Sequence, residues 1–366
     1  MEVRNHYDLV VAGAGPAGSA AAITAARMGA SVLLLEQGRF PRQKVCGEFV
    51  SSESLELLRQ FLVHAPNGLK IVENAPRIER ARMFLQGTSV EIPVLASASI
   101  PRFVMDEALW RAAEAVGVEC RDGVTVEDIH SNGEFAVSTS DGDFTATAAI
   151  ATTGRWSKLR QPIAKRNAKK LIGVKAHFRE LNPTLSTDLY FFSGGYCGVQ
   201  PIDDETVNAC ALVRADVATD LQSVFGLNGA LAKRARGWVA VMDPVSTSPL
   251  IFAEPEPERD GVLFAGDAAG FIDPFAGDGI SLALRTGSAA AQATMHLIAG
   301  RVPLGEMVRT YRRRYEKQFL PAFRAAKQAR WVIGCWRPLP QFAVQLLRFP
   351  KIAKAVFART RGLEAA

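Results

Sequence analysis

Three glycines near the start of the chain, Gly13, Gly15 and Gly18, have the spacing with which a backbone approaches a phosphate. The first allows a tight turn, the second lets the backbone approach a pyrophosphate, and the third lets a helix pack closely on a strand. The N–H groups at the start of that helix would attract the phosphates. Glu36 follows 18 residues after Gly18, which is about where a carboxylate meets ribose hydroxyls. The segment therefore predicts dinucleotide binding; the alternative is a Gly/Ala-rich helix start without a ligand.

A second glycine-rich segment, residues 266–280, follows another apolar stretch. Asp267, at the expected carboxyl end of a strand, is placed to accept hydrogen bonds from a sugar-like chain. Pro274, Gly277 and Gly279 leave a bare backbone that opens a helix. Such a helix start can stabilise negative charge on a nearby group, for example the N1–O2 edge of a reduced flavin. The alternative is a glycine-rich connection with one capping aspartate.

Regular patterns predict the elements that must hold these two segments. Apolar runs and capping residues indicate an N-terminal strand–turn–helix–strand unit, two further helices and a β-meander with Asx-Gly turns. The expected elements are a strand over 7–12, a helix to about residue 28, a strand over 30–35, a helix from Ser51 or Ser52 to about Leu62, a helix over 106–116, a strand over 118–120 and the meander over 122–151. Residues 65–100 are expected to be β-like and irregular.

The pattern changes to longer strands between residue 171 and about residue 252, and another buried strand over 261–267 follows. The chain is therefore predicted to leave the nucleotide-binding domain and to return to it. The expected fold class is α/β: a discontinuous Rossmann-like domain, a second α+β domain on a mostly antiparallel sheet, and a C-terminal helical tail. The expected boundaries are 1–75, 100–165 and 256–300 for the first domain, 76–99 and 166–255 for the second, and 301–366 for the tail.

The composition is ordinary for a globular protein, with 48% hydrophobic and 22% charged residues among 366. Five scattered cysteines without a CxxC pair, and histidines without ligand spacing, suggest neither a metal site nor a disulfide framework. Residues 301–366 hold fifteen Lys/Arg and three Asp/Glu, although the whole chain carries only +6. No apolar run is long enough to span a membrane. We expect a cytoplasmic protein whose tail either contacts a membrane surface or packs as ordinary helices on the first domain.

The two glycine segments, Arg102 and the stretch Thr152–Arg160 (Thr-Thr-Gly-Arg-Trp-Ser-Lys-Leu-Arg) together resemble the FAD-dependent aromatic-hydroxylase superfamily. This group includes p-hydroxybenzoate hydroxylase, flavin-dependent halogenases and geranylgeranyl reductases, and the resemblance covers about residues 5–300. It implies that the dinucleotide is FAD. The cofactor contacts that it implies are Gly13, Gly15, Pro16, Ala17, Gly18, Glu36, Gln37, Arg42, Cys46, Gly47, Arg102, Val126, Gly154, Gly266, Asp267, Pro274, Gly277, Asp278, Gly279 and Ile280.

The loop Phe40–Glu48 (Phe-Pro-Arg-Gln-Lys-Val-Cys-Gly-Glu) is most similar to the geranylgeranyl-reductase-like branch, where a Cys-Gly segment approaches the flavin. Cys46 is therefore the residue for which we expect a catalytic role, beside the flavin or the substrate. The alternative is a small core residue. Glu48 is interpreted as a solvated loop charge, with a catalytic acid as the alternative.

Two departures from the superfamily's patterns bear on the chemistry. Thr153-Gly154 stands where many of its hydroxylases have an Asp-Gly pair that helps to position NAD(P)H, so direct nicotinamide binding is in doubt and NAD(P)H is an open candidate for the electron donor. The halogenases' Trp-x-Trp-x-Ile-Pro stretch is missing, and the segment that corresponds to it, Gly195–Pro201, contains no tryptophan. Halogenation is therefore not expected.

Aromatic residues on the strands that should cover the flavin, together with one from the second glycine segment, are candidates for the substrate pocket. They are Tyr190, Phe192, Tyr196 and Phe275. The alternative is the aromatic core of a sheet. His177 alternates with Lys175 and Arg179 along one strand and is interpreted as a residue of the sheet face.

The expected function is that of an FAD-dependent oxidoreductase that exchanges hydride between the flavin and an apolar organic substrate, such as an isoprenoid, a polyketide or an aromatic lipid. One alternative is a monooxygenase that hydroxylates or epoxidises its substrate through a C4a-hydroperoxyflavin. Another is a flavin-binding redox or membrane-docking protein without turnover. The basic and aromatic tail suits a surface of anionic lipid, and no pattern of a nucleic-acid-binding module is found.

Overall fold

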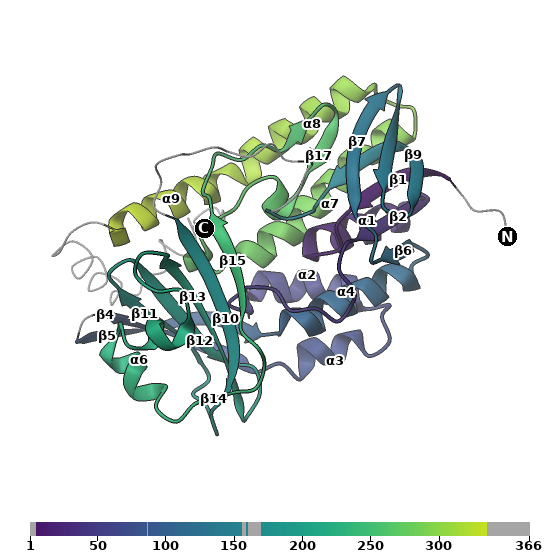
Figure 1. Ribbon diagram of the computed structural model, residues 1–366. Coiled ribbons are helices and arrows are strands. Elements are labelled where there is room, and N and C mark those ends of the chain that lie inside the picture. Colours follow the sequence, from purple (N-terminus) through teal and green to yellow (C-terminus); the bar gives the residue numbers. More distant parts are fainter. Residues whose placement is uncertain (1–4, 86, 156–158, 160–169, 335–366) are drawn as a thin grey trace.

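The computed structural model describes residues 5–85, 87–155, 159 and 170–334 (Figure 1). Within them the strands form two sheets, and helices α2 (Ser52–Leu62) and α4 (Arg102–Ala115) lie between these sheets. The other helices are α1 (Pro16–Arg27), α3 (Gly68–Glu73), α5 (Leu221–Phe225), α6 (Gly229–Arg234), α7 (Gly279–Ile298), α8 (Leu304–Gln318) and α9 (Leu320–Gly334), with 3₁₀ turns η1 (Gly266–Ala268) and η2 (Pro274–Ala276).

The first sheet has the strand order β16-β17-β9-β1-β2-β6, and β7 and β8 extend it beside β9. Its strands are β1 (His6–Ala12), β2 (Val32–Glu36), β6 (Glu119–Asp122), β7 (Val126–Asn132), β8 (Glu134–Thr139), β9 (Gly142–Ala151), β16 (Glu258–Arg259) and β17 (Val262–Phe264). β1 runs parallel to both β2 and β9. The ends of β1 and β2 nearest the glycine turn are buried and mostly apolar, as expected for central strands of a parallel sheet.

The return of the chain to the first sheet is made by β17, which runs parallel to β9. Helix α7 then packs on α1, where a Cβ atom on Gly287 would lie 2.0 Å from the backbone oxygen of Ala17. Only glycine permits so close a contact between the two helices. The first and last parts of the described chain thus share one core, as the discontinuous organisation predicted.

The second sheet has the order β14-β10-β13-β12-β11-β4-β5-β3, with β15 paired to β10. Apart from the parallel pair β4–β11, its neighbours are antiparallel. Its strands are β3 (Phe49–Val50), β4 (Arg77–Leu85), β5 (Thr88–Ser99), β10 (Leu171–Arg179), β11 (Ser186–Phe192), β12 (Gly195–Pro201), β13 (Thr206–Arg214), β14 (Val239–Ala240) and β15 (Val245–Leu250). The predicted fold class is confirmed, while the boundaries between the domains stay a prediction.

Two local expectations need correction. The irregular region after residue 65 contains the short helix α3, which begins after Asn67 in a left-handed conformation. Helix α4 begins at Arg102, four residues earlier than expected, because Pro101 precedes it as the N-cap. The tail forms α8 and α9 as far as Gly334, and the rest of the predicted tail, 335–366, lies outside the described residues.

Candidate cofactor and active site

The first glycine turn connects β1 to α1 with a geometry that only glycine satisfies. Gly13 has φ of 101°, and its N–H donates to Leu35 O at 2.7 Å. A Cβ atom on Gly18 would lie 1.8 Å from Gly13 O, so helix and turn are in direct backbone contact. A Cβ atom on Gly15 would meet nothing nearer than Arg102 Nη2, at 3.9 Å. The turn therefore leaves open space at Gly15, where the fingerprint calls for a pyrophosphate.

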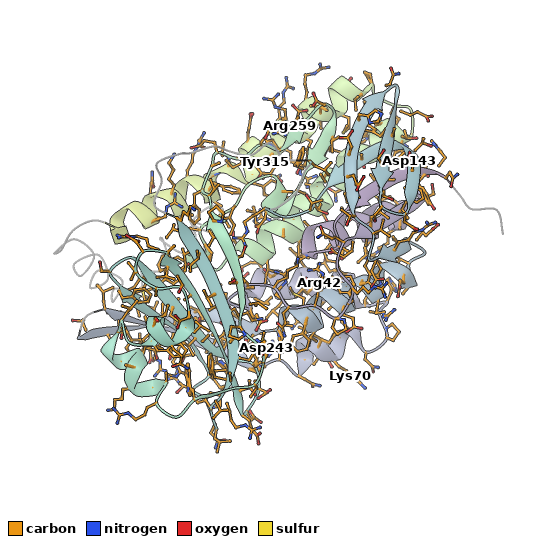
Figure 2. All side chains as sticks on the ribbon, in the orientation of Figure 1. Arg42, Lys70, Asp143, Asp243, Arg259 and Tyr315 are labelled. Atoms are coloured by element: carbon orange, nitrogen blue, oxygen red, sulfur yellow. The ribbon has the colours of Figure 1, made fainter. Side chains whose placement is uncertain are left out.

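Glu36, at the end of β2, is buried and held against this turn. Its Oε2 accepts hydrogen bonds from Ala14 N at 2.8 Å and from Arg42 Nη2 at 3.0 Å, and its Oε1 accepts one from Gly38 N at 2.9 Å. Figure 2 shows Arg42 between the two sheets. The carboxylate is therefore fixed beside the glycine turn, as ribose recognition requires.

Buried polar groups beside the turn test whether a cofactor fits here. Within the described part of the chain, Arg42 Nε, Arg42 Nη1 and Thr153 Oγ1 are buried and have no hydrogen-bond partner. Arg42 Nη1 lies 3.6 Å from Asp106 Oδ2, close enough for an ion pair but too far for a hydrogen bond. Buried polar groups almost always have partners. Buried polar groups without partners beside the glycine turn and Glu36 fit the diphosphate and hydroxyls of FAD.

The second glycine segment provides the helix start that the sequence predicted. Gly266 has φ of 60°, and its N–H donates to Thr286 Oγ1 at 2.9 Å, while Asp267 Oδ2 lies 3.7 Å from Arg155 Nε. Asp273 caps η2 by accepting from Phe275 N at 3.1 Å. Helix α7 then opens at Gly279, where a side chain would meet no atom within 4 Å. The N-terminus of a 20-residue helix is therefore open beside η2.

The predicted cofactor residues gather where the fold is expected to bind a dinucleotide, at the carboxyl ends of parallel strands. Gly13, Gly15, Pro16, Ala17 and Gly18 follow β1, Glu36 and Gln37 end and follow β2, Gly154 follows β9, Gly266 and Asp267 follow β17, and Pro274, Gly277, Asp278, Gly279 and Ile280 belong to η2 and the start of α7. Val126 begins β7, two residues after Val124, whose N–H donates to Glu36 O at 2.9 Å. Their contacts with the cofactor stay predictions.

The loop before β3 brings Cys46 and Gly47 toward α4. Cys46 Sγ accepts from Glu48 N at 3.3 Å, and Cys46 O accepts from Asn208 Nδ2 at 3.0 Å. Arg102 donates from Nε and Nη2 to both oxygens of Asp106, each at 2.8 Å. Burial acts to lower the pKa of Arg102, but the charge of Asp106 and the sulfur of Cys46 hold it above its ordinary value. The cysteine and the arginine thus lie side by side near the glycine turn.

The interpretation of Glu48 as a solvated loop charge is wrong. Its side chain is fully buried and accepts hydrogen bonds from Lys175 Nζ and from Arg102 N, while its Oε2 lies 3.0 Å from His177 Nε2. Burial acts to raise the pKa of Glu48, but the hydrogen bond from His177 and the charge of Lys175 hold it below its ordinary value. His177 lies on a sheet face, as predicted, and this face is turned toward the loop.

The four aromatic candidates are divided between the two faces of the second sheet, because successive side chains of a strand point to opposite faces. Tyr190 and Phe192 lie in the apolar cluster on the far face of the second sheet, where Tyr190 stacks on Phe84 at 4.5 Å. Phe191, Tyr196 and Phe275 instead form one cluster on the face shared with Lys175 and His177. Their ring centroids lie 5.7 to 6.2 Å apart. Phe191, which is not among the predicted residues, belongs to this cluster because the strand register places it opposite Tyr196.

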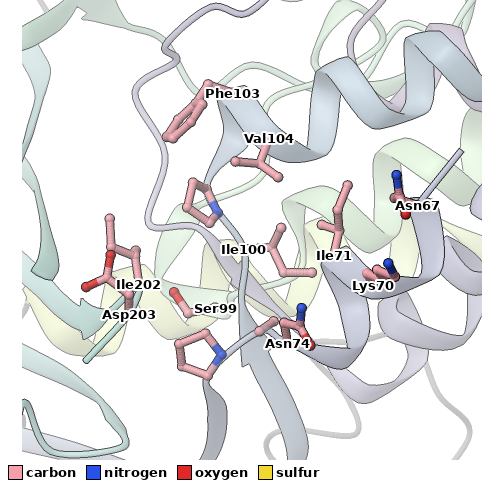
Figure 3. Close-up of a pocket in the computed structure, with 13 residues that line it drawn as sticks. Asn67, Lys70, Ile71, Asn74, Ser99, Ile100, Phe103, Val104, Ile202 and Asp203 are labelled. Atoms are coloured by element: carbon pink, nitrogen blue, oxygen red, sulfur yellow. The ribbon is translucent and has the colours of Figure 1, made fainter. Parts of the chain in front are cut away.

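One cavity lies beside the start of α4 and another beside the aromatic cluster. One, of about 410 Å³, is bounded by α3, the start of α4 and the turn at Ile202 and Asp203, and none of its lining residues is a predicted cofactor contact (Figure 3). The other, of about 360 Å³, lies between residues 252–255, residues 271–273 and α9, and its lining includes Phe252, Phe271 and Asp273. Since Tyr196 donates to Asp273 Oδ1 at 3.4 Å, this second cavity adjoins the aromatic cluster.

Neither a metal site nor a membrane-spanning helix is found in the part of the chain that the structure describes. No group of three or more His, Cys, Asp and Glu side chains is arranged to hold a metal ion there. No helix among the described residues is both long and apolar enough to cross a bilayer.

Comparison with known proteins relates the chain to flavoenzymes. A family model described as FAD dependent oxidoreductase matches residues 8–45. The chain is 25% identical to conditioned medium factor receptor 1 of Dictyostelium discoideum over 76% of its own length, and it spans 61% of that receptor. It is 26% identical to digeranylgeranylglycerophospholipid reductase 2 of Methanopyrus kandleri, over 88% of this chain and 85% of the relative. It is 28% identical to menaquinone reductase of Mycolicibacterium smegmatis, over 78% and 75%.

Solved structures share the fold. The flavin-dependent brominase Bmp2 superposes with a TM-score of 0.80 at 21% identity, over 98% of this chain and 94% of that one. A geranylgeranyl bacteriochlorophyll reductase-like protein from Thermoplasma acidophilum superposes with a TM-score of 0.75 at 20% identity, over 98% and 96%. With both glycine segments at one sheet edge, a matching FAD-dependent oxidoreductase model and reductases among its relatives, the chain is an FAD-dependent oxidoreductase that is similar to digeranylgeranylglycerophospholipid reductases.

Proposed function

We propose that this FAD-dependent oxidoreductase reduces an apolar organic substrate, of the isoprenoid, polyketide or aromatic-lipid class. The observation that carries the proposal is the apolar aromatic cluster Phe191, Tyr196 and Phe275, which joins the second sheet to η2. Phe275 belongs to the turn that immediately precedes the open start of α7. A substrate held there would meet aromatic surface, which favours apolar molecules.

Relatives support this substrate class. Two of them are named reductases, one of digeranylgeranylglycerophospholipid and one of menaquinone. Both named molecules carry long apolar chains. The halogenase fold neighbours support flavin chemistry in general, but this chain lacks their paired tryptophans between Gly195 and Pro201.

The residues of this chain have separate tasks in the proposed reaction. When bound, FAD supplies the hydride chemistry. The start of α7 would stabilise negative charge through its free N–H groups. Tyr196 and Phe275 would exclude water from the reacting face, and Asp273 fixes both by accepting from Tyr196 Oη and from Phe275 N. Burial raises the pKa of Asp273.

The proposed reaction needs an electron donor for the flavin. NAD(P)H is the donor that we propose to test first, although Thr153 stands where many hydroxylases of the superfamily have an aspartate.

Helix α8 buries Met307, Tyr311 and Tyr315 on one side, and its exposed side carries arginines and a lysine. We propose that this basic side contacts anionic lipid, which would bring the enzyme to an apolar substrate.

The test is a strictly anaerobic assay with chemically reduced enzyme and menaquinone or a polyprenyl lipid. A reductase should oxidise its flavin and yield a product with two added hydrogens without oxygen. The monooxygenase alternative would give no product without oxygen and an oxygenated product in air. If neither condition changes the substrate or the flavin, the proposed substrate class is wrong.

A further inference from the structure

Three ionisable side chains that belong to neither glycine segment meet on the inner face of the second sheet. They are Glu48 from the loop before β3, and Lys175 and His177 from β10. Glu48 and Lys175 have no exposed surface, and His177 is 4% exposed. A buried charge is costly unless it is paired and hydrogen-bonded, so the fold keeps this cluster at a cost to stability.

The backbone of Glu48 adds to that cost. Its φ of 63° lies in the left-handed region, which residues with a Cβ atom rarely adopt. Strained conformations of this kind persist where the surroundings hold them in place, and they gather at functional sites. Here Glu48 O accepts from Ile100 N at 3.0 Å and Glu48 N donates to Cys46 Sγ, so hydrogen bonds at both backbone groups of Glu48 hold its left-handed conformation.

The cluster connects the second sheet with both parts of the cofactor site. Through Arg102 N it holds the first turn of α4, whose Arg102 side chain reaches toward Gly15. The next residue, Phe49, lies against Gly277, where a Cβ atom would come within 3.1 Å of its ring. Glu48 is therefore placed between the Cys46–Gly47 loop and the turn that opens α7.

Polar and ionisable side chains face this cluster from α4, β10, β13 and the loop before β3. Lys175 and His177 come from β10, Arg102 and Asp106 from α4, and Cys46 from the loop itself. On β13, next to β10, Asn208 is 1% exposed and has no partner for its Oδ1 among the described residues. The one carboxylate of the cluster, Glu48, balances the one lysine, so removing either changes the charge beside the cofactor site.

We propose that Glu48, held by Lys175 and His177, is a positioning residue that fixes the Cys46–Gly47 loop and sets the electrostatic field at the flavin. Its effect is on the reduction potential of bound FAD, because charge near the ring tunes its electronics. The proposal goes beyond the proposed function and does not depend on the substrate, since the potential is measured with the cofactor alone.

The experiment measures the midpoint potential of FAD-loaded wild type, Glu48→Gln, Lys175→Met and the double variant by spectroscopic titration. Glu48→Gln removes a negative charge and should raise the potential, because a reduced flavin gains negative charge. Lys175→Met should lower it, and the double variant should return close to wild type. A tenfold change in the two-electron equilibrium corresponds to about 30 mV, and we expect at least that for each single variant.

The matched control is Asp188→Asn, on the opposite face of the same sheet. Asp188 is also fully buried and also paired, with Arg82 and Arg234. Asp188→Asn should lower the free energy of unfolding of the cofactor-free protein in urea and leave the midpoint potential of bound FAD unchanged. If Glu48→Gln fails to fold, Glu48→Gly keeps the left-handed bend without the side chain and should raise the potential likewise. The proposal is overturned if the midpoint potential shifts in the same direction in Glu48→Gln and Lys175→Met, or if it does not shift in either. An equal shift in the Asp188→Asn control would overturn it as well.

Discussion

The two glycines at the start of α1 have different physical roles, and alanine at each should separate them. At Gly18 an added Cβ atom would lie 1.8 Å from Gly13 O and 2.5 Å from Thr152 Oγ1. Ordinary van der Waals contact needs about 3.5 Å, so the helix must move away from the turn. That movement strains the hydrogen bond of 2.6 Å from Thr152 Oγ1 to Gly13 O. Gly18→Ala should therefore destabilise the fold before any cofactor binds.

The size of the effect follows from three contributions. Overpacking costs about 1–3 kcal/mol, and a weakened hydrogen bond costs about 1 kcal/mol. Alanine in a helix gains about 1 kcal/mol over glycine. The net loss for Gly18→Ala is about 1–3 kcal/mol in the free energy of unfolding. Gly15→Ala meets no atom within 3.8 Å and has an ordinary φ of −76°, so its stability should change by less than about 0.5 kcal/mol.

The affinity for FAD should rank these variants differently from their stability. A methyl group at Gly15 occupies the space through which the backbone approaches the pyrophosphate, so Gly15→Ala should weaken FAD binding at least about tenfold, or 1.4 kcal/mol. Urea unfolding of the cofactor-free proteins measures stability, and quenching of FAD fluorescence measures affinity. If Gly15→Ala binds FAD as tightly as wild type, or Gly18→Ala unfolds at the same urea concentration, the roles assigned to these glycines are refuted.

Three further predictions follow from the site and the core. Phe191→Leu should raise KM for an apolar substrate several-fold, whereas Tyr190→Phe, on the other face of the sheet, should leave KM unchanged in the same steady-state assay. Because the pKa of Glu48 is lower in the folded chain, its ionised carboxylate contributes to the free energy of unfolding above the ordinary pKa of 4.5. This contribution is lost as pH falls through the lower folded pKa. Urea unfolding across the acid range should show the loss in wild type and not in Glu48→Gln. Tyr311→Phe removes the hydrogen bond of 2.8 Å to Phe264 O and should cost about 1–2 kcal/mol in unfolding free energy without changing FAD affinity.

The glycine segments could be predicted from the sequence because their constraints are local. A positive φ at Gly13 and a backbone contact at Gly18 depend on residues a few positions apart or on the adjoining strand. The return of the chain through β17 was also predictable, because a short apolar strand followed by Gly266 and Asp267 repeats the form of the first segment.

The sequence predicted the aromatic cluster of Phe191, Tyr196 and Phe275 only in part, for a reason of geometry. Alternation along β11 shows that Tyr190 and Phe191 point to opposite faces, but it does not say which face meets the cofactor domain. That choice depends on pairing across β12 and β13, where Phe191 lies opposite Tyr196 and Tyr196 opposite Leu212. The register between distant strands decides which aromatic side chains share a face of the sheet, and no local sequence pattern encodes that register.

The burial of Glu48 follows from a pattern that the sequence does contain. Along β10 the even-numbered residues from Ile172 to Phe178 are apolar, and the odd-numbered positions include Lys175 and His177. If both faces of that strand are covered, two ionisable groups on one face need a partner, because an unpaired buried charge is too costly. The strand itself offers no acid, so a carboxylate has to come from another element. The charged loop before β3 is expected to approach the flavin, and Glu48 is the acid nearest Cys46 within it. The loop and the strand considered together therefore predict that Glu48 pairs with Lys175 and His177.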